Sequence, residues 1–140
     1  MVLNEQNQIL LGKRNNPPAK GYWFVPGGRV FKNEAQATAF ERICQTELRL
    51  EYPYTQAKLL GLYDHFYQDS VFGDEIDTHY INAPYLVNLD HTQGLNLPTE
   101  QHLAYRWLSL DKLEQDNTVH PNSKIFMEAL KTAQGLNEHD

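Results

Sequence analysis

The chain has 140 residues, with 12 Lys and Arg against 18 Asp and Glu, and a formal net charge of −6 at pH 7. A chain of this length forms one domain and buries roughly two thirds of the surface that its unfolded form exposes. The acidic balance argues against a nucleic-acid partner, because binding to long polyanions is driven by clustered Lys and Arg. A small anionic ligand needs only a local basic pocket.

Cysteine content and hydropathy point to the cytoplasm. Cys44 is the sole cysteine, so a disulfide within the chain is impossible and a buried, inert thiol is expected. The N-terminus carries no charged and apolar leader, and no apolar run approaches the roughly 20 residues that a membrane helix needs. We therefore expect a cytoplasmic protein with no membrane partner.

The first part of the chain predicts three strands. Val2-Leu3 and residues 8–12 flank a polar turn, as in a hairpin. Residues 22–25 are aromatic and β-branched and end at the turn Pro26-Gly27-Gly28. Such a turn suits a ligand that approaches the main chain.

A helix is predicted from Asn33 or Glu34 to Leu48, with Asn33 as its N-cap and Glu34 at the favourable end of its dipole. Glu47 projects into the middle of the apolar stripe formed by Ala37, Phe40, Ile43 and Cys44. A carboxylate on the buried side is costly unless it is paired, and the helix C-terminus also disfavours negative charge. An arginine or a metal ion is expected to compensate it. The alternative is a carboxylate that bends out to solvent or pairs with a lysine.

The rest of the chain mixes strands with a second main helix, which predicts an α/β sandwich with a mixed sheet between helical layers. The expected strands are 57–63, continuing toward 65–67, then 78–89 with Pro84 at an edge or bulge, and 105–108. The expected helices are a brief one at 111–114 and an amphipathic one at 121–133, with Ile125, Phe126, Ala129 and Leu130 inward.

The spacing of four residues resembles a Nudix box, which binds a divalent cation and a diphosphate. Five residues separate Gly28 from Glu34, seven separate Glu34 from Arg42, and Glu47 follows. The general pattern has two further glutamates and a glycine, and here these positions hold Ile43, Thr46 and Arg49. Glu47 alone remains of three carboxylates. This loss resembles one subfamily, the GDP-mannose mannosyl hydrolases.

Several other segments resemble that subfamily in the same order, over about residues 2 to 127. They are 11–14, 18–30, 65–67, 78–80, 100–102 and 105–108. The resemblance implies the Nudix α/β/α sandwich as a single domain over 1–140. By comparison with the subfamily, we expect the chain to lack part of the N-terminal strand region. A homodimer is also expected from the resemblance.

The resemblance implies a magnesium site, with manganese as a possible substitute. Its protein ligands would be the Glu47 carboxylate, the Gln101 amide and the Gly27 carbonyl, and substrate phosphate oxygens would complete the octahedral shell. His102, in the loop Glu100-Gln101-His102, would be the general base, because imidazole titrates near neutral pH. A surface histidine is the alternative for His102.

Further residues are candidates for contacts with the substrate. Arg29 could place its guanidinium against the diphosphate and stabilise charge on departing GDP. Arg14 and Tyr80 could add hydrogen bonds there, and His65 and Tyr80 are secondary catalytic candidates. Arg42 is expected to orient a carboxylate such as Glu34.

The implied reaction is hydrolysis of a nucleotide sugar, GDP-mannose or GDP-glucose, to GDP and the free hexose. Water attacks the anomeric carbon, so a carbon–oxygen bond breaks. Removal of two helix glutamates takes away groups that would activate water at phosphorus. The alternatives are an ordinary Nudix pyrophosphohydrolase that yields GMP and a sugar phosphate, and a non-catalytic nucleotide-sugar binding module.

Overall fold

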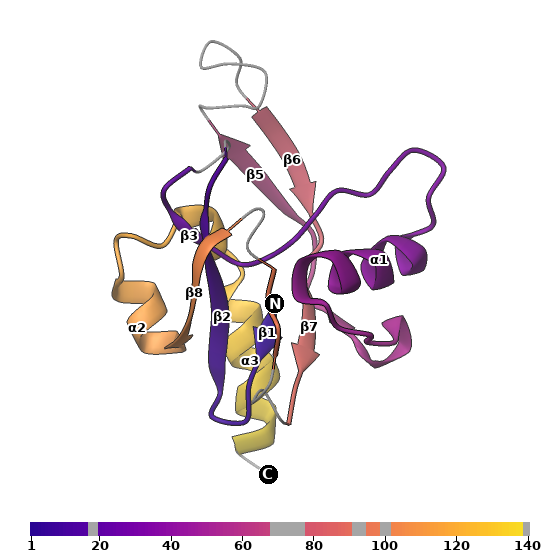
Figure 1. The fold of residues 1–140 in the computed structure, drawn as a ribbon. Coiled ribbons are helices and arrows are strands. Elements are labelled where there is room, and N and C mark those ends of the chain that lie inside the picture. The colour runs from indigo at the N-terminus through magenta and orange to yellow at the C-terminus, as the bar shows by residue number, and fades with distance from the viewer. Residues whose placement is uncertain (17–19, 68–77, 91–94, 99–101, 139–140) are drawn as a thin grey trace.

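The computed structural model describes the chain except for residues 17–19, 68–77, 91–94, 99–101 and 139–140 (Figure 1). Its strands are β1 (Val2–Leu3), β2 (Gln8–Arg14), β3 (Trp23–Phe24), β4 (Lys58–Leu59), β5 (Tyr63–Tyr67), β6 (Thr78–Asn82), β7 (Tyr85–Asn88) and β8 (His102–Ser109). Its helices are α1 (Gln36–Leu48), α2 (Leu110–Gln115) and α3 (Met127–Glu138), with short 3-10 turns η1 (Tyr54–Gln56) and η2 (Pro121–Ser123). None of the described helices is both long enough and apolar enough to cross a membrane.

The main sheet is built around β2. Along one edge β2 pairs antiparallel with β8, from Gln8 opposite Ser109 to Arg14 opposite His102. Along the other edge β2 pairs first with β1 and then with β3. β1 runs parallel to β7, which pairs antiparallel with β4, so the predicted mixed sheet is confirmed.

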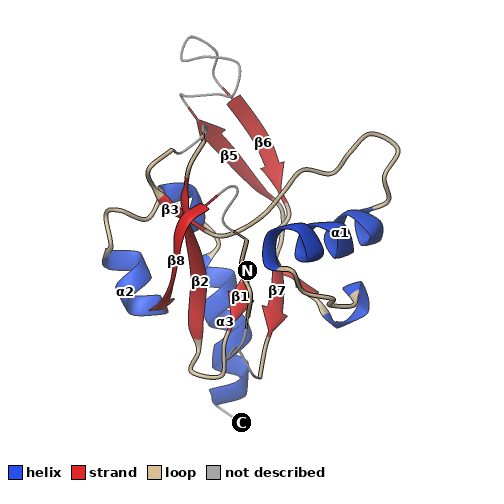
Figure 2. Cartoon of the chain, in the orientation of Figure 1, coloured by secondary structure: helices blue, strands red, loops and turns tan. Residues whose placement is uncertain are grey.

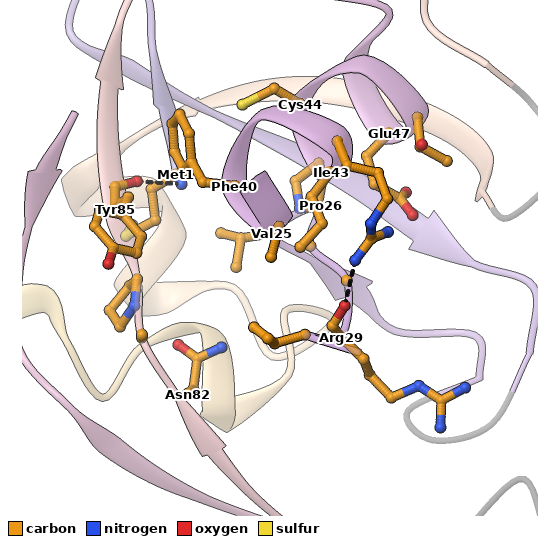
Figure 3. Close-up of a pocket in the computed structure, with 18 of the residues that line it drawn as sticks. Met1, Val25, Pro26, Arg29, Phe40, Ile43, Cys44, Glu47, Asn82 and Tyr85 are labelled. Carbon is orange, nitrogen blue, oxygen red and sulfur yellow. Dashed lines mark hydrogen bonds between the residues drawn. The ribbon is translucent and has the colours of Figure 1, made fainter. Parts of the chain in front are cut away.

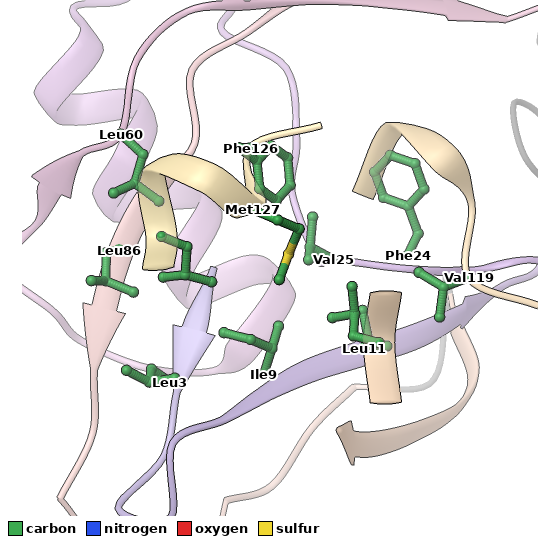
Figure 4. Close-up of a cluster of buried hydrophobic side chains, with 12 residues drawn as sticks. Leu3, Ile9, Leu11, Phe24, Val25, Leu60, Leu86, Val119, Phe126 and Met127 are labelled. Carbon is green, nitrogen blue, oxygen red and sulfur yellow. The ribbon is translucent and has the colours of Figure 1, made fainter. Parts of the chain in front are cut away.

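Helices cover both faces of this sheet, as the alternation of side chains along a strand requires. On one face Ile9 and Leu11 pack with Phe126, Met127 and Leu130, which belong to α3 or directly precede it (Figure 4). On the other face the sheet packs against Phe40, Cys44 and Leu48 of α1. Val2 and Leu10 contact Leu48, and Val87 contacts Phe40 and Cys44. The helical layers and the sheet between them (Figure 2) confirm the predicted α/β/α sandwich.

The helix that carries Glu47 begins later than predicted. α1 starts at Gln36, and its N-cap, Ala35, makes no side-chain hydrogen bond. Asn33 does not cap the helix, because its φ of 65° places it in the left-handed region of the preceding loop. The prediction that Glu47 lies on the buried face is confirmed, since this residue is 6% exposed.

Two expected strands are each divided in the structure. The strand predicted from 57 into 67 breaks at Gly61, whose φ of 128° suits glycine, and gives β4 and β5. The strand predicted at 78–89 breaks before β7 at Pro84, which cannot donate a ladder hydrogen bond. β5 and β6 therefore leave the main sheet and form a separate two-stranded ribbon.

The C-terminal helix also differs from its prediction. The chain forms η2 first, and α3 begins only at Met127. Phe126 and Leu130 are buried as predicted, and Ala129 packs against the same core. Ile125 was expected to face inward, but it is 41% exposed because the continuous helix that would turn it inward does not form.

Candidate functional site

A cavity of about 1020 Å³ lies among α1, the loop that follows β3, and the chain from β6 into β7 (Figure 3). Val2 of β1, Phe24 of β3 and the following Val25 also line it. Six of the residues predicted to bind metal or substrate or to act in catalysis share its wall: Arg14, Gly27, Arg29, Glu47, His65 and Tyr80. The tertiary structure thus brings together residues that are far apart in the chain.

Glu47 and His102 form the buried polar pair of this site. His102 is 1% exposed and is not among the described residues that line the cavity. Its Nε2 lies 3.8 Å from Oε2 of Glu47, which is within ion-pair distance but too long for a hydrogen bond. Neither ring nitrogen of His102 has a hydrogen-bond partner among the described residues. Glu47 therefore contacts the cavity directly, and His102 lies next to Glu47 in the interior.

The position of His102 depends on the absence of a side chain at Gly12. His102 is the first residue of strand β8, whereas the resemblance to the subfamily predicted that it lies in a loop. Its ring packs directly over Gly12, where an added Cβ would lie 2.4 Å from Nδ1. Gly12 in β2 therefore admits the imidazole to the interior.

Arg42 fixes the loop that precedes α1. Its guanidinium donates to both carboxylate oxygens of Glu34, at 2.8 and 3.0 Å, which confirms the expected orienting role. It also donates to the backbone oxygen of Arg29 at 2.6 Å. The pKa of Arg42 is raised, chiefly by the hydrogen bonds to Glu34, and the charge of Glu47 acts in the same direction.

The glycine turn is anchored just before it begins. The backbone nitrogen of Val25 donates to Oγ of Ser123 at 3.1 Å. Gly27 lines the cavity, and a Cβ added there would meet nothing within 4 Å. The backbone at Gly27 is therefore open to a ligand.

His65 and Tyr80 face each other across the β5–β6 ribbon and both line the cavity. His65 is 2% exposed, with Phe24 and Phe126 beside its ring. Burial lowers the pKa of His65 to about 4, and His120 acts in the same direction. The imidazole is therefore neutral at pH 7.

Three arginines and one carboxylate make up the charged side chains among the described residues that line the cavity. The arginines are Arg14, Arg29 and Arg42, and the carboxylate is Glu47. Arg29 is exposed, and its guanidinium extends away from α1 (Figure 3). The cavity is thus locally basic in an acidic protein, as a diphosphate requires.

The donor set at the cavity fits a magnesium ion that is held partly by substrate. The described residues contain no cluster of three or more His, Cys, Asp or Glu that could hold a metal by themselves. Mg²⁺ is commonly bound through one or two carboxylates, waters and substrate phosphates rather than by an all-protein cage. Glu47 and the open Gly27 backbone match that pattern. Gln101, the third expected ligand, lies outside the described residues.

Some residues of the cavity wall were not predicted. Phe31, Asn82 and Tyr85 line it. Asn82 and Tyr85 flank the strand break at Pro84. They were missed because the sequence pattern predicted one continuous strand from 78 to 89. Phe31 could have been found from the sequence, because it is an aromatic residue within the loop of the Nudix box.

Comparison with known proteins identifies the family. The model of the NUDIX domain matches residues 1–130, so the chain belongs to the Nudix hydrolase superfamily, as the box spacing predicted. Members of this family bind nucleotides and sugar nucleotides, and its hydrolases generally use divalent metals such as Mg²⁺.

A curated relative is the low-salt glycan biosynthesis protein Agl8 of Haloferax volcanii, 40% identical over 126 residues, which cover 90% of this chain and 67% of Agl8. The MutT protein of Methanosarcina mazei Go1 has a similar fold, with a TM-score of 0.75 at 20% identity over 96% of this chain and 90% of that one. The MutT Nudix hydrolase of Burkholderia pseudomallei has a TM-score of 0.68 at 27% identity, over 91% and 94%.

Proposed function

We propose that this protein hydrolyses a GDP-hexose, GDP-mannose or GDP-glucose, to GDP and the free sugar in a magnesium-dependent reaction. The observation that carries the proposal is the single carboxylate that α1 presents to the cavity. Ile43 and Thr46 line the same wall at the two positions where the Nudix box has its other glutamates. The groups that would activate water at phosphorus are therefore missing from the described wall.

In the proposed reaction, water forms a bond to the anomeric carbon with inversion. The bond between that carbon and the diphosphate oxygen breaks, and GDP departs with the bonding electrons. A base takes the proton of the water. When bound at Glu47 and Gly27, the metal would neutralise charge on the departing diphosphate. Arg14 and Arg29 contribute further positive charge at the cavity.

His102 is proposed as the base, and its surroundings define what that role requires. The ring is buried and its Nε2 lies 3.8 Å from Oε2 of Glu47, so the role requires a water that reaches Nε2 beside that carboxylate. His65 and Tyr80, which line the cavity directly, are proposed to bind and orient the sugar or the leaving group. The neutral state of His65 at pH 7 lets it both donate and accept a hydrogen bond.

The glycan biosynthesis role printed in the name of Agl8 supports the substrate class, because glycans are assembled from activated sugars. Binding of a diphosphate-linked sugar also agrees with a cavity that holds three arginines and one carboxylate.

Reaction of GDP-mannose in water enriched in ¹⁸O tests the proposal directly. Mass spectrometry should find the label in mannose and none in a phosphate-containing product. Label in GMP or mannose phosphate would overturn the proposal in favour of an ordinary pyrophosphohydrolase. Binding without any turnover would favour a nucleotide-sugar binding module.

A further inference from the structure

Phe31 is an exposed aromatic residue in the wall of the cavity. It lies in the loop between the glycine turn and α1, is 55% exposed, and lines the same cavity as Glu47, Arg14 and Arg29. Exposure of a large apolar ring to water is unfavourable by itself, so the contacts of Phe31 indicate what the ring can bind.

The loop holds Phe31 in a defined place. The backbone nitrogen of Phe31 donates to Oε1 of Glu34 at 3.0 Å, and its backbone oxygen accepts from the nitrogen of Glu34 at 3.1 Å. Arg42 bridges Glu34 to the backbone oxygen of Arg29 on the other side of Phe31. The residue is therefore fixed by its neighbours before any ligand arrives.

The ring itself is half covered. The guanidinium carbon of Arg42 lies 4.0 Å from the centroid of the Phe31 ring, as in a cation–π contact. With Arg42 on one side and more than half of the residue exposed, the rest of the ring faces solvent at the cavity. An ordered aromatic ring with an open face suits the stacking of a planar group.

We propose that Phe31 is the stacking platform for the nucleobase of the substrate. This inference rests on the proposed function, because the base is the planar group of a GDP-hexose. The diphosphate would lie toward the arginines and Glu47, and the base toward the loop. Stacking tolerates any base, since every base has a π face, so Phe31 contributes affinity rather than the choice of guanine.

Calorimetric titration with GDP, with inorganic pyrophosphate and with GDP-mannose, each with Mg²⁺, tests the platform in the wild type and in variants. Phe31→Ala should weaken GDP binding by about 5- to 150-fold, the range that base stacking gives, and should leave pyrophosphate binding unchanged. Phe31→Trp should retain GDP affinity, whereas Phe31→Leu should behave like the alanine variant because it has no π face.

Phe66→Ala is the matched control. Phe66 is also exposed, at 65%, and its ring also stacks on a basic side chain, His79, at 4.4 Å between centroids. It is not among the described residues that line the cavity, so its removal should change none of the three affinities.

Three outcomes would overturn the platform while the proposed function stands. The first is equal GDP affinity in Phe31→Ala and wild type. The second is an equal loss for pyrophosphate, which would mean that the loop had collapsed. The third is a loss for GDP-mannose without a loss for GDP, which would place the hexose on the ring. Failure of wild-type protein to bind GDP-mannose at all would overturn the proposed function itself.

Discussion

Glu47 and His102 are the two residues on which the proposed chemistry depends most. Each is buried, and Nε2 of His102 lies 3.8 Å from Oε2 of Glu47. His102 can act at this position in two ways: as a base toward water, or as a positioning residue that keeps the carboxylate directed at the cavity. The two roles affect different measurable quantities.

His102→Ala should lower turnover of GDP-mannose by about 100-fold or more, in line with general-base contributions. Binding of GDP and of Mn²⁺, measured by titration and by electron paramagnetic resonance, should stay close to wild type if His102 is the base. A parallel loss of Mn²⁺ affinity would make it a positioning residue for Glu47. Unchanged turnover would remove His102 from the reaction altogether.

His65 gives the protein a defined sensitivity to acid. Because its folded pKa of about 4 lies below the ordinary value of 6.5, the unfolded chain binds a proton first as pH falls. Stability is therefore unaffected above pH 6.5 and is lost between pH 6.5 and 4. Between pH 7.5 and 5 this residue should remove about 2 kcal/mol from the free energy of unfolding.

Urea unfolding at the two pH values measures that loss. His65→Gln, which cannot be protonated, should show a pH dependence smaller than that of the wild type by about this amount. If both proteins lose the same free energy between pH 7.5 and 5, His65 titrates normally in the folded state and its burial is not maintained in solution.

At the scale of elements, the pairing of β2 with β8 carries His102 to the site. The close packing of the His102 ring over Gly12 makes this pairing dependent on a single missing side chain. The bulge between Gly12 and Arg14 lies at the same end of the ladder, where Arg14 stands opposite His102. A change at residue 12 should therefore disturb both stability and the site.

Gly12→Ala should destabilise the fold by about 1–3 kcal/mol, the usual cost of overpacking, because the buried ring must move away from the new methyl group. Urea unfolding measures the loss. Gly27→Ala is the control for stability, since a Cβ there meets nothing within 4 Å and should cost little. Equal stabilities of the two variants would show that His102 does not pack over Gly12.

At the scale of the whole molecule, the chain is acidic but places three arginines around one cavity. The cavity can therefore attract an anionic ligand although the net charge of the protein is negative. Long-range repulsion of polyanions and local binding of a diphosphate are compatible because charge interactions are screened beyond about 10 Å at 0.1 M salt.

The homodimer stays a prediction, and light scattering after size exclusion should find a particle of twice the chain mass.

Ligand binding should be visible in global stability. GDP with Mg²⁺ at about 100 times its dissociation constant should add about 2.7 kcal/mol to the free energy of unfolding and raise the Tm by roughly 5–10 °C. Glu47→Gln keeps the shape of the side chain but removes its charge, so it should abolish the part of the shift that depends on Mg²⁺. Scanning calorimetry with GDP alone is the reference. An identical Mg²⁺ effect in Glu47→Gln would exclude Glu47 as a ligand.

Much of the fold could be predicted because local patterns report it directly. The apolar periodicity of residues 37–44 placed Glu47 on the buried face of α1, and the spacing of Gly28, Glu34 and Arg42 identified the family. The contact between Arg42 and Glu34 was also expected, although Glu34 lies in the loop before α1 and not in the helix. The start of α1 could not be predicted from Asn33, since its left-handed φ depends on how the loop closes around Arg42.

The sequence by itself determined the layered α/β architecture, the Nudix family and the single carboxylate of the box. The architecture follows from the order of apolar patterns along the chain, and the family and the carboxylate follow from spacing within one segment. Only the tertiary structure decided that β5 and β6 leave the main sheet, that His102 lies buried over Gly12 and beside Glu47, and that Phe31 borders the cavity. These features depend on contacts between segments that are distant in the chain, where packing and strand register, rather than local propensity, set the position of each side chain.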